Sequence, residues 1–382
     1  QESLAMVGRP PPLGPRRAPH PFFVHASLIC IQVFFGGGAV VGKFGVHGTN
    51  PILFAFLRDG VAGPILYLAA CVFTKEVRPR CRDVPRLLVA AFGLFLGQVM
   101  MITGLKLVDP VMASAWQPSQ PIFTAVLAIS VGYERVSARK VLGILAAVAG
   151  AVFMVTWGAG GETSSGRASK IGLAGNIFFV LNCFGTSVYV VVCKKLLQRY
   201  RSLCVTAWSY LIASVLSLAT ACLVNETPGL LQLFCTDDDP EVQRACVVGA
   251  WAVPASMLLP LAYWIVFQSV LAYMLMTWAN QYAQASVVSA YTVLQPLTSG
   301  SISAVLVLAR GRAWADAYGL ESPGVQDLGV LGIALGLGLL FTDRSTSIQA
   351  ACREGEEDKR QALGDSVAPA EEGRSSSCLL ET

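Results

Sequence analysis

The chain alternates apolar blocks of about 20 residues with short polar or charged connections. Each block is bounded by Gly, Pro or charged residues and is long enough to cross a lipid bilayer once as a helix. The eighth block has an apolar lead-in at 246–253 and the tenth is short, so a nine-helix arrangement stays open. The pattern predicts an all-α integral membrane protein with ten transmembrane helices, at residues 22–46, 51–73, 85–105, 110–131, 140–157, 171–193, 203–224, 255–278, 283–309 and 325–341.

Composition favours a membrane protein over a soluble one. Apolar residues make up 54% of the 382 residues and charged residues 14%, against about 25% charged in soluble domains. Such a chain has too little charge to cover a water-facing surface. Most of the 11 cysteines lie inside apolar blocks, where they are expected to pack as small residues. Cys235 and Cys246 share a polar loop, but the sequence does not fix the geometry that a disulfide needs.

The distribution of Lys and Arg predicts the orientation in the membrane. With the N-terminus in the cytoplasm, 20 of the 28 Lys and Arg lie on the inner side and six on the outer side. Because cytoplasmic loops carry the excess of positive charge, both termini are expected in the cytoplasm. The acceptor sequon Asn225-Glu226-Thr227 then falls in an outer loop. The membrane, whether plasma or organellar, is left open.

An internal repeat relates the fourth and ninth blocks. Five blocks per half is an odd number, so two such halves cross the membrane in opposite directions, as in many secondary transporters. Pro118, Pro121 and Pro296 lie deep in these blocks, where each removes a helical hydrogen bond and frees a carbonyl. A packing kink and a cavity lining are both open for each proline, and their occurrence in both halves favours the cavity. At a constant offset of 175, Ser114-Ala115-Trp116 and Gln120-Pro121 align with Ser289-Ala290-Tyr291 and Gln295-Pro296.

The repeat divides the chain into five parts. Residues 1–21 form a cytoplasmic N-terminal segment, and residues 22–157 form the first five-helix repeat. A Gly/Ser-rich outer linker at 158–170 precedes the second five-helix repeat at 171–341. Residues 342–382 have too little apolar content to fold alone and are predicted to be a disordered cytoplasmic tail.

An ordered set of short motifs runs through both halves. In the first half these are Gly42-Lys43, Leu57-Arg58, Val61-Ala62, Pro64, Gln98, Gly104-Leu105, Gln117 to Pro121 and Glu134, and in the second half Lys194-Lys195-Leu196, Thr206-Ala207-Trp208 and Ser289 to Pro296. In this order the chain resembles the drug/metabolite transporter superfamily with its EamA-type repeats, and within it the plant exporters that include the Walls-Are-Thin-related proteins. The resemblance covers Phe23 to Phe341. One departure is that Ala309-Arg310-Gly311-Arg312 stands where an acidic residue is expected after the ninth span.

Three charged residues lie three or more residues from both ends of a predicted span, namely Lys43, Arg58 and Asp59. Each costs about 2.5–3.5 kcal/mol there unless it is paired, hydrated or able to snorkel. Lys43 is near the outer interface, so an interfacial anchor is an alternative to a ligand contact. Arg58 lies deeper and is the candidate for binding an anionic group such as a carboxylate. Asp59 is a candidate for neutralising a cation on another helix, and it is not an obvious partner for Arg58, because adjacent residues of a helix point in different directions.

Further polar and aromatic residues lie at depths where an unsatisfied amide is unfavourable. Each of them either bonds a neighbouring helix or contacts a solute. Together with Lys43 and Arg58, they predict a substrate-binding pocket suited to an amphipathic organic solute. These residues are Gln98, Trp116, Gln117, Gln120, Asn182, Tyr189, Tyr291 and Gln295.

Other motifs carry no chemistry of their own. Residues 37–43 match a phosphate-binding loop, but Phe44 replaces the Ser or Thr that binds Mg²⁺ and no strand precedes the motif. The pair Gly38 and Gly42 is expected to permit close helix packing rather than dimerisation, although a homodimer stays open. The three histidines lack neighbouring ligands or a triad. We therefore expect no enzyme activity, metal, cofactor or nucleic-acid partner.

The sequence thus predicts a transporter of small organic solutes, such as amino acids, organic acids or hormone-like metabolites, that works by alternating access. Its partners would be the solute and the lipid bilayer. An exchanger of nucleotide sugars or organic phosphates with the same fold is an alternative, because paired cations bind phosphate. A membrane receptor or scaffold without transport is an alternative of another class. Coupling to protons is left open.

Overall fold

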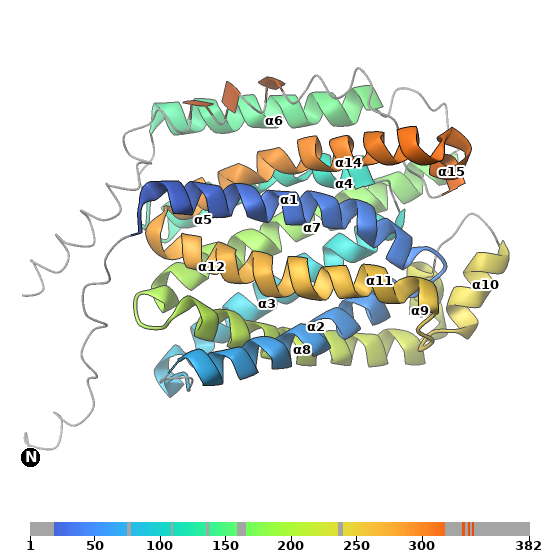
Figure 1. Ribbon diagram of the computed structural model, residues 1–382, viewed down its shortest axis with the longest axis horizontal. Helices are drawn as coiled ribbons and strands as arrows, with labels where there is room; N and C mark the ends of the chain where they lie inside the picture. The colour runs from blue at the N-terminus through green and yellow to red at the C-terminus, as the bar shows by residue number, and fades with distance from the viewer. Residues whose placement is uncertain are drawn as a thin grey trace, which may run out of the picture.

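The computed structural model describes residues 19–74, 78–107, 110–134, 137–158, 166–235 and 240–317, together with 331, 332, 335, 336, 338 and 339. These residues form helices and turns, with no strand among them. Most of the predicted N-terminal segment, the predicted tail and most of the tenth predicted helix lie outside the described residues. Figure 1 shows the helices running side by side along one direction.

The first half contains α1 (Pro21–Val46), α2 (Pro51–Phe73), the 3₁₀ turn η1 (Cys81–Asp83), α3 (Val84–Leu107), α4 (Pro110–Ala115), the 3₁₀ turn η2 (Gln117–Ser119), α5 (Gln120–Ser130) and α6 (Ala138–Gly158). The second half contains α7 (Gly166–Leu197), α8 (Ser202–Glu226), α9 (Pro228–Phe234), α10 (Pro240–Val248), α11 (Ala255–Tyr263), the π-helix η4 (Trp264–Ala272), α12 (Tyr273–Tyr282), α13 (Ala285–Ala290), the 3₁₀ turn η5 (Tyr291–Leu294), α14 (Gln295–Arg310) and α15 (Arg312–Ala317).

Within the described residues, seven helical segments are long and apolar enough to cross a membrane. Large apolar side chains on them are exposed, such as Leu259 at 78% and Leu308 at 87%, as expected for lipid-facing positions. The fourth predicted span is divided among α4, η2 and α5, and the fifth corresponds to α6. The protein is therefore a multi-pass integral membrane protein, helical throughout the membrane-length segments that the structure describes. The seven segments are Pro21–Val46, Pro51–Phe73, Cys81–Leu107, Ala174–Leu197, Ser202–Glu226, Ala255–Tyr282 and Ala285–Arg310.

Both repeat copies contain a broken helix, as the prolines predict. Pro121 cannot donate to the carbonyl of Gln117, and the hydroxyl of Thr292 donates to it instead at 2.9 Å. Gln117 and Thr292 lie 175 residues apart, which is the offset of the repeat. The carbonyl of Gln120 accepts from the hydroxyls of Thr124 and Ser187 at 3.0 and 3.1 Å. At this break, backbone carbonyls thus accept from the hydroxyls of Thr292 and Ser187 on other helices and of Thr124 on α5 itself.

The packing of the helices repeats between the halves. α3 packs closely along α7. The continuous run α11–η4–α12, which corresponds to α3 in the second half, packs along α1. α2 packs along α8, α5 packs on α7, and α14 packs on α1. Close approach depends on glycine: a Cβ on Gly38 would lie 1.4 Å from Nε2 of Gln268, and one on Gly42 would lie 2.7 Å from the Trp264 ring. The expected packing role of this glycine pair is confirmed.

One end of the bundle, here the α10 end, is formed by α9, α10 and α15 (Figure 1). A disulfide joins Cys235 to Cys246 between α9 and α10. The amide of Asn225 accepts from Asn50 at 2.7 Å and donates to the carbonyl of Ala250 at 3.3 Å. The sequence predicts the sequon in a loop, but Asn225 lies in the last turn of α8. Its two side-chain bonds hold it against the start of α2 and against Ala250.

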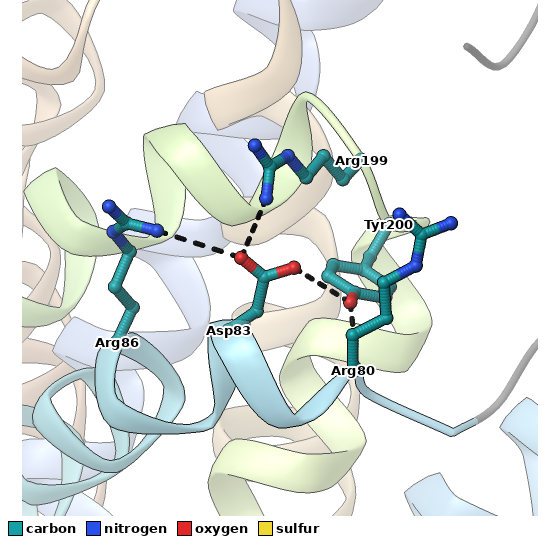
Figure 2. A network of polar contacts seen from close by, with 5 residues as sticks. All are labelled: Arg80, Asp83, Arg86, Arg199 and Tyr200. Atoms are coloured by element: carbon teal, nitrogen blue, oxygen red, sulfur yellow. Dashed lines mark hydrogen bonds and ion pairs between the residues drawn. The ribbon is translucent and has the colours of Figure 1, made fainter. Parts of the chain in front are cut away.

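The opposite end, here the η1 end, contains η1 and the turn between α7 and α8. Asp83 is 2% exposed and accepts from Arg199 at 2.8 Å and from the hydroxyl of Tyr200 at 2.9 Å, with Arg86 at 3.6 Å (Figure 2). The Tyr200 hydroxyl also accepts from the backbone of Arg80 at 3.0 Å. Burial raises the pKa of Tyr200, so its hydroxyl stays protonated and able to donate at neutral pH. This network joins the start of α3 to the α7–α8 turn.

We expect Asp83→Asn to destabilise the protein by about 1.5–3 kcal/mol, because it removes a buried, charge-assisted acceptor from Arg199 and Tyr200. The measurement is the midpoint of thermal unfolding in detergent. Arg86→Ala is the matched control, since its contact with Asp83 is longer, at 3.6 Å, and its exposed side chain is expected to contribute about 0–1 kcal/mol. Equal midpoints for Asp83→Asn and the unchanged protein would show that the network does not hold this end together.

Candidate solute-binding site

A buried ion pair lies inside α2. Arg58 and Asp59 are 2% and 0% exposed, and Nε of Arg58 lies 3.2 Å from Oδ1 of Asp59. Ser217 on α8 donates to Oδ2 of Asp59 at 2.9 Å. These neighbours are not obvious partners in the sequence, yet they pair, because the long arginine side chain folds back so that Nε reaches the adjacent carboxylate. The pairing lowers the cost of both charges in the apolar interior.

The guanidinium of Arg58 is also held by an aromatic ring. Its Cζ atom lies 5.1 Å from the centroid of the Trp264 ring, within the range of a cation–π interaction. Trp264 is fully buried and donates from Nε1 to the carbonyl of Gly38 at 2.8 Å. The η4 π-helix places this ring, which therefore links α1, α2 and η4. Nη2 of Arg58 has no hydrogen-bond partner among the described residues.

Tyrosines and one glutamine complete the surroundings of the ion pair. Nε2 of Gln98 on α3 donates to the hydroxyl of Tyr210 on α8 at 2.7 Å, while Oε1 of Gln98 has no partner among the described atoms. The ring of Tyr273 lies 5.5 Å from that of Tyr210 and 5.8 Å from that of Tyr189. The hydroxyl of Tyr189 bonds Thr277 at 2.9 Å. We name this set the Arg58 cluster: Arg58, Asp59, Gln98, Tyr189, Tyr210, Ser217, Trp264 and Tyr273.

A second group of predicted site residues forms a chain of amides on the other side of α3. Gln117 donates to Oδ1 of Asn182 at 2.9 Å, and Asn182 donates to the carbonyl of Gly97 at 2.7 Å. Trp116 donates to Asn176 at 2.8 Å. These bonds run from the broken helix to α7 and α3. Gly97 precedes Gln98, so the amide chain and the Arg58 cluster share one turn of α3.

The remaining predicted residues lie in two further places. Gln295 on α14 donates to Gln32 on α1 at 2.9 Å, and the hydroxyl of Tyr291 bonds the ring of His25. The side chain of Gln120 is buried at the start of α5. The structure therefore brings Gln98 and Tyr189 to Arg58, places Trp116, Gln117 and Asn182 together, and puts Gln120, Tyr291 and Gln295 elsewhere in the broken helices.

Lys43 has a contact that was not expected. It lies in the last turn of α1, and its ammonium donates to the carbonyl of Leu105 near the end of α3 at 3.2 Å. An interfacial anchor and a ligand contact both stay predictions for Lys43. Lys43 joins the ends of two helices at the α10 end of the bundle.

Sequence reasoning missed four members of the Arg58 cluster, namely Tyr210, Ser217, Trp264 and Tyr273. All four lie in apolar spans, where an uncharged aromatic or small polar residue is indistinguishable from ordinary packing. The charge of Arg58 pointed to the place, but only the packing of α8 and η4 against α2 shows which side chains surround it.

Comparison with known proteins identifies the family of this fold. The EamA-like transporter family matches residues 23–156 and again 173–311. A WAT1-related protein of Arabidopsis thaliana is 25% identical over 202 residues, which cover 46% of this chain and 54% of that protein. The uncharacterized transporter YetK of Bacillus subtilis is 24% identical over 186 residues, covering 48% of this chain and 55% of that protein.

Another uncharacterized transporter of Bacillus subtilis, YyaM, is 24% identical over 264 residues, covering 68% of this chain and 76% of that protein. The chain thus spans about half the length of the WAT1-related protein and of YetK. A solved crystal structure superposes with a TM-score of 0.59 at 17% identity, over 84% of this chain and 96% of that one, which shows the fold alone. The relatives point to a transporter rather than an enzyme. With two matches that together cover most of the described helices, this chain belongs to the EamA-like transporter family.

Proposed function

We propose that the protein carries small organic solutes with a carboxylate or a similar acceptor group across the membrane by alternating access, and that the Arg58 cluster binds the solute. The observation that carries this proposal is the buried guanidinium whose Nη2 atom lacks a partner. A buried donor left unpaired costs about 1–3 kcal/mol or more when it is charged. An acceptor on a bound solute removes this cost.

The unpaired atoms of the cluster suggest what the solute presents. Arg58 offers a donor, Gln98 offers an acceptor at Oε1, and tyrosine and tryptophan rings surround both. Such a site complements a solute that has a hydrogen-bond acceptor, a hydrogen-bond donor and an apolar body, as amino acids and hormone-like acids do. The exchange of phosphate compounds is less well supported, because Asp59 already neutralises Arg58 and would repel a multiply charged anion.

The arrangement of helices supports two inverted five-helix repeats and a ten-helix protein. In such a repeat, α3 corresponds to the run α11–η4–α12, α7 to α1, and α2 to α8. The contact of α3 with α7 then corresponds to that of the run with α1, and the contact of α2 with α8 corresponds to itself. The bond between Gln117 and Thr292 joins two residues at the repeat offset, as expected where a two-fold axis passes between two copies. Opposed repeats around a central site are the architecture of alternating access.

The exposed cations support a cytoplasmic location for the η1 end and the N-terminus. Arg80, Arg82, Arg199 and Arg201 are all exposed there. At the α10 end lie the disulfide and the sequon, which suit an outer face. Both termini are then cytoplasmic, in the plasma membrane or an organelle membrane.

The first test is solute flux into liposomes that contain the purified protein, with and without a pH gradient. A neutral zwitterion adds no net charge to the paired Arg58 and Asp59, so we expect its flux to need no pH gradient. A carboxylate anion adds one negative charge in a poorly solvated site, so its flux is expected to rise when protons can accompany it. Amino acids, aromatic acids and sugar nucleotides form the panel. Ligand binding without flux of any compound would favour a receptor.

The second test separates the binding role of Arg58 from its structural one. Arg58→Gln leaves the Asp59 carboxylate buried and unpaired, and we expect it to destabilise the protein by about 3–5 kcal/mol. The double change Arg58→Gln with Asp59→Asn removes both charges and should recover most of this stability while solute flux stays absent. Arg201→Gln, at an exposed arginine of the η1 end, is the control. Flux near the normal rate in the double variant would remove Arg58 from the binding site.

A further inference from the structure

Two lysines hold equivalent positions in the two halves, at opposite ends of the bundle. Lys43 lies in the last turn of α1 and Lys194 in the last turn of α7, the first helix of each half. Lys43 donates to the carbonyl of Leu105 on α3 at 3.2 Å, and Lys194 donates to that of Asn280 on α12 at 2.7 Å. Leu105 and Asn280 lie 175 residues apart, which is again the offset of the repeat.

Each lysine satisfies carbonyls that a helix end leaves without a donor. The last four carbonyls of a helix have no partner within it and carry the negative end of its dipole. Lys194 reaches one of them, that of Asn280, and also donates to the carbonyl of Ala283, the residue that follows α12. An ammonium bond to such carbonyls is charge-assisted and therefore stronger than a neutral one.

The two bonds connect two closely packed helix pairs. α3 packs most closely on α7, and α1 packs most closely on α11, η4 and α12, so each tight pair combines one helix from each half. Lys43 bridges from α1 to α3, and Lys194 bridges from α7 to α12. Both lysines thus span the boundary between the two pairs, one at the α10 end and the other at the η1 end. The Arg58 cluster takes side chains from both pairs and lies between them.

A carboxylate strengthens the connection at the η1 end. Oε1 of Glu134, which follows α5, accepts from the backbone of Ser286 in the first turn of α13 at 3.0 Å. The turn between α12 and α13 therefore has a cation, Lys194 of α7, bound at the end of α12. It also has an anion, Glu134, bound at the start of α13. At the repeat offset, the counterpart of Glu134 is Ala309, which cannot supply this second bond.

We propose that Lys43 and Lys194 are paired latches of the transport cycle, and that releasing either one opens the Arg58 cluster to the face on which that lysine lies. Glu134 supports the Lys194 latch. The proposal rests on the proposed alternating-access function and adds the residues that control it. With both latches formed, the Arg58 cluster is buried from both ends, and the conformation is an occluded one.

The test compares labelling of cysteines placed behind each latch. Ser114 on α4 and Ser289 on α13 are 0% and 1% exposed, lie 175 residues apart and follow the helices that Lys43 and Lys194 bind. Their hydroxyls bond carbonyls of their own helices, so Ser→Cys is a mild change at each. Purified protein in liposomes of known orientation, with its exposed native cysteines replaced by serine, is treated with a membrane-impermeant maleimide on each face in turn.

Lys43→Ala should raise the labelling rate of Ser114→Cys about tenfold from the α10 face and lower that of Ser289→Cys, since a charge-assisted bond is lost on one side only. Lys194→Ala should do the reverse, and Glu134→Gln should change labelling in the same direction as Lys194→Ala. Lys195→Ala, at the exposed neighbour of Lys194, should change neither rate.

If both labelling rates change in the same direction, or neither changes, the lysines only cap the ends of α3 and α12. Glu134→Gln keeps both lysines and gives a second reading if Lys194→Ala does not fold. The labelling needs no solute, so the outcome is distinct from that of the flux measurement. Opposite shifts without flux of any solute would contradict the transport function, whereas normal flux without opposite shifts would contradict the latches alone.

Discussion

Polar groups inside a bilayer have no water to bind, and this constraint organises the interior of the protein. Arg58 is accommodated because Asp59 and the Trp264 ring lie against it, and Asp59 because Ser217 donates to its second oxygen. Where a proline breaks a helix, a hydroxyl from another helix supplies the missing donor. These partners come from helices distant in sequence, so satisfying each polar group also fixes which helices pack together.

The closest helix packing joins the two halves of the sequence. α3 packs with α7, α2 with α8, and α1 with the run through η4, so each of these pairings takes one helix from either half. Small residues allow the close approach, as Gly93 shows: a Cβ there would lie 2.8 Å from the carbonyl of Gly185.

Sequence alone predicted the elements better than the site. Apolar block length and proline placement predicted the seven long apolar segments of the described residues and the two breaks, because both follow from local chemistry. The energetic cost of a buried charge pointed to Arg58. Helix geometry does not point to Asp59 as the partner of Arg58, because that geometry takes no account of the length of the arginine side chain. Tyr210, Trp264 and Tyr273 give no signal in the sequence, since their importance arises only from how α8, η4 and α12 pack around α2.

An exact two-fold relation between the halves would make the two open conformations equal in free energy. The chain departs from that relation where Glu134 holds the start of α13 while Ala309 stands at the equivalent position. The α10 end has a bond of its own, because Lys106 on α3 donates to the carbonyl of Val46 at the end of α1 at 2.9 Å. Different sets of bonds therefore hold the two ends of the bundle. Under the proposed alternating access, the two open conformations would then differ in free energy.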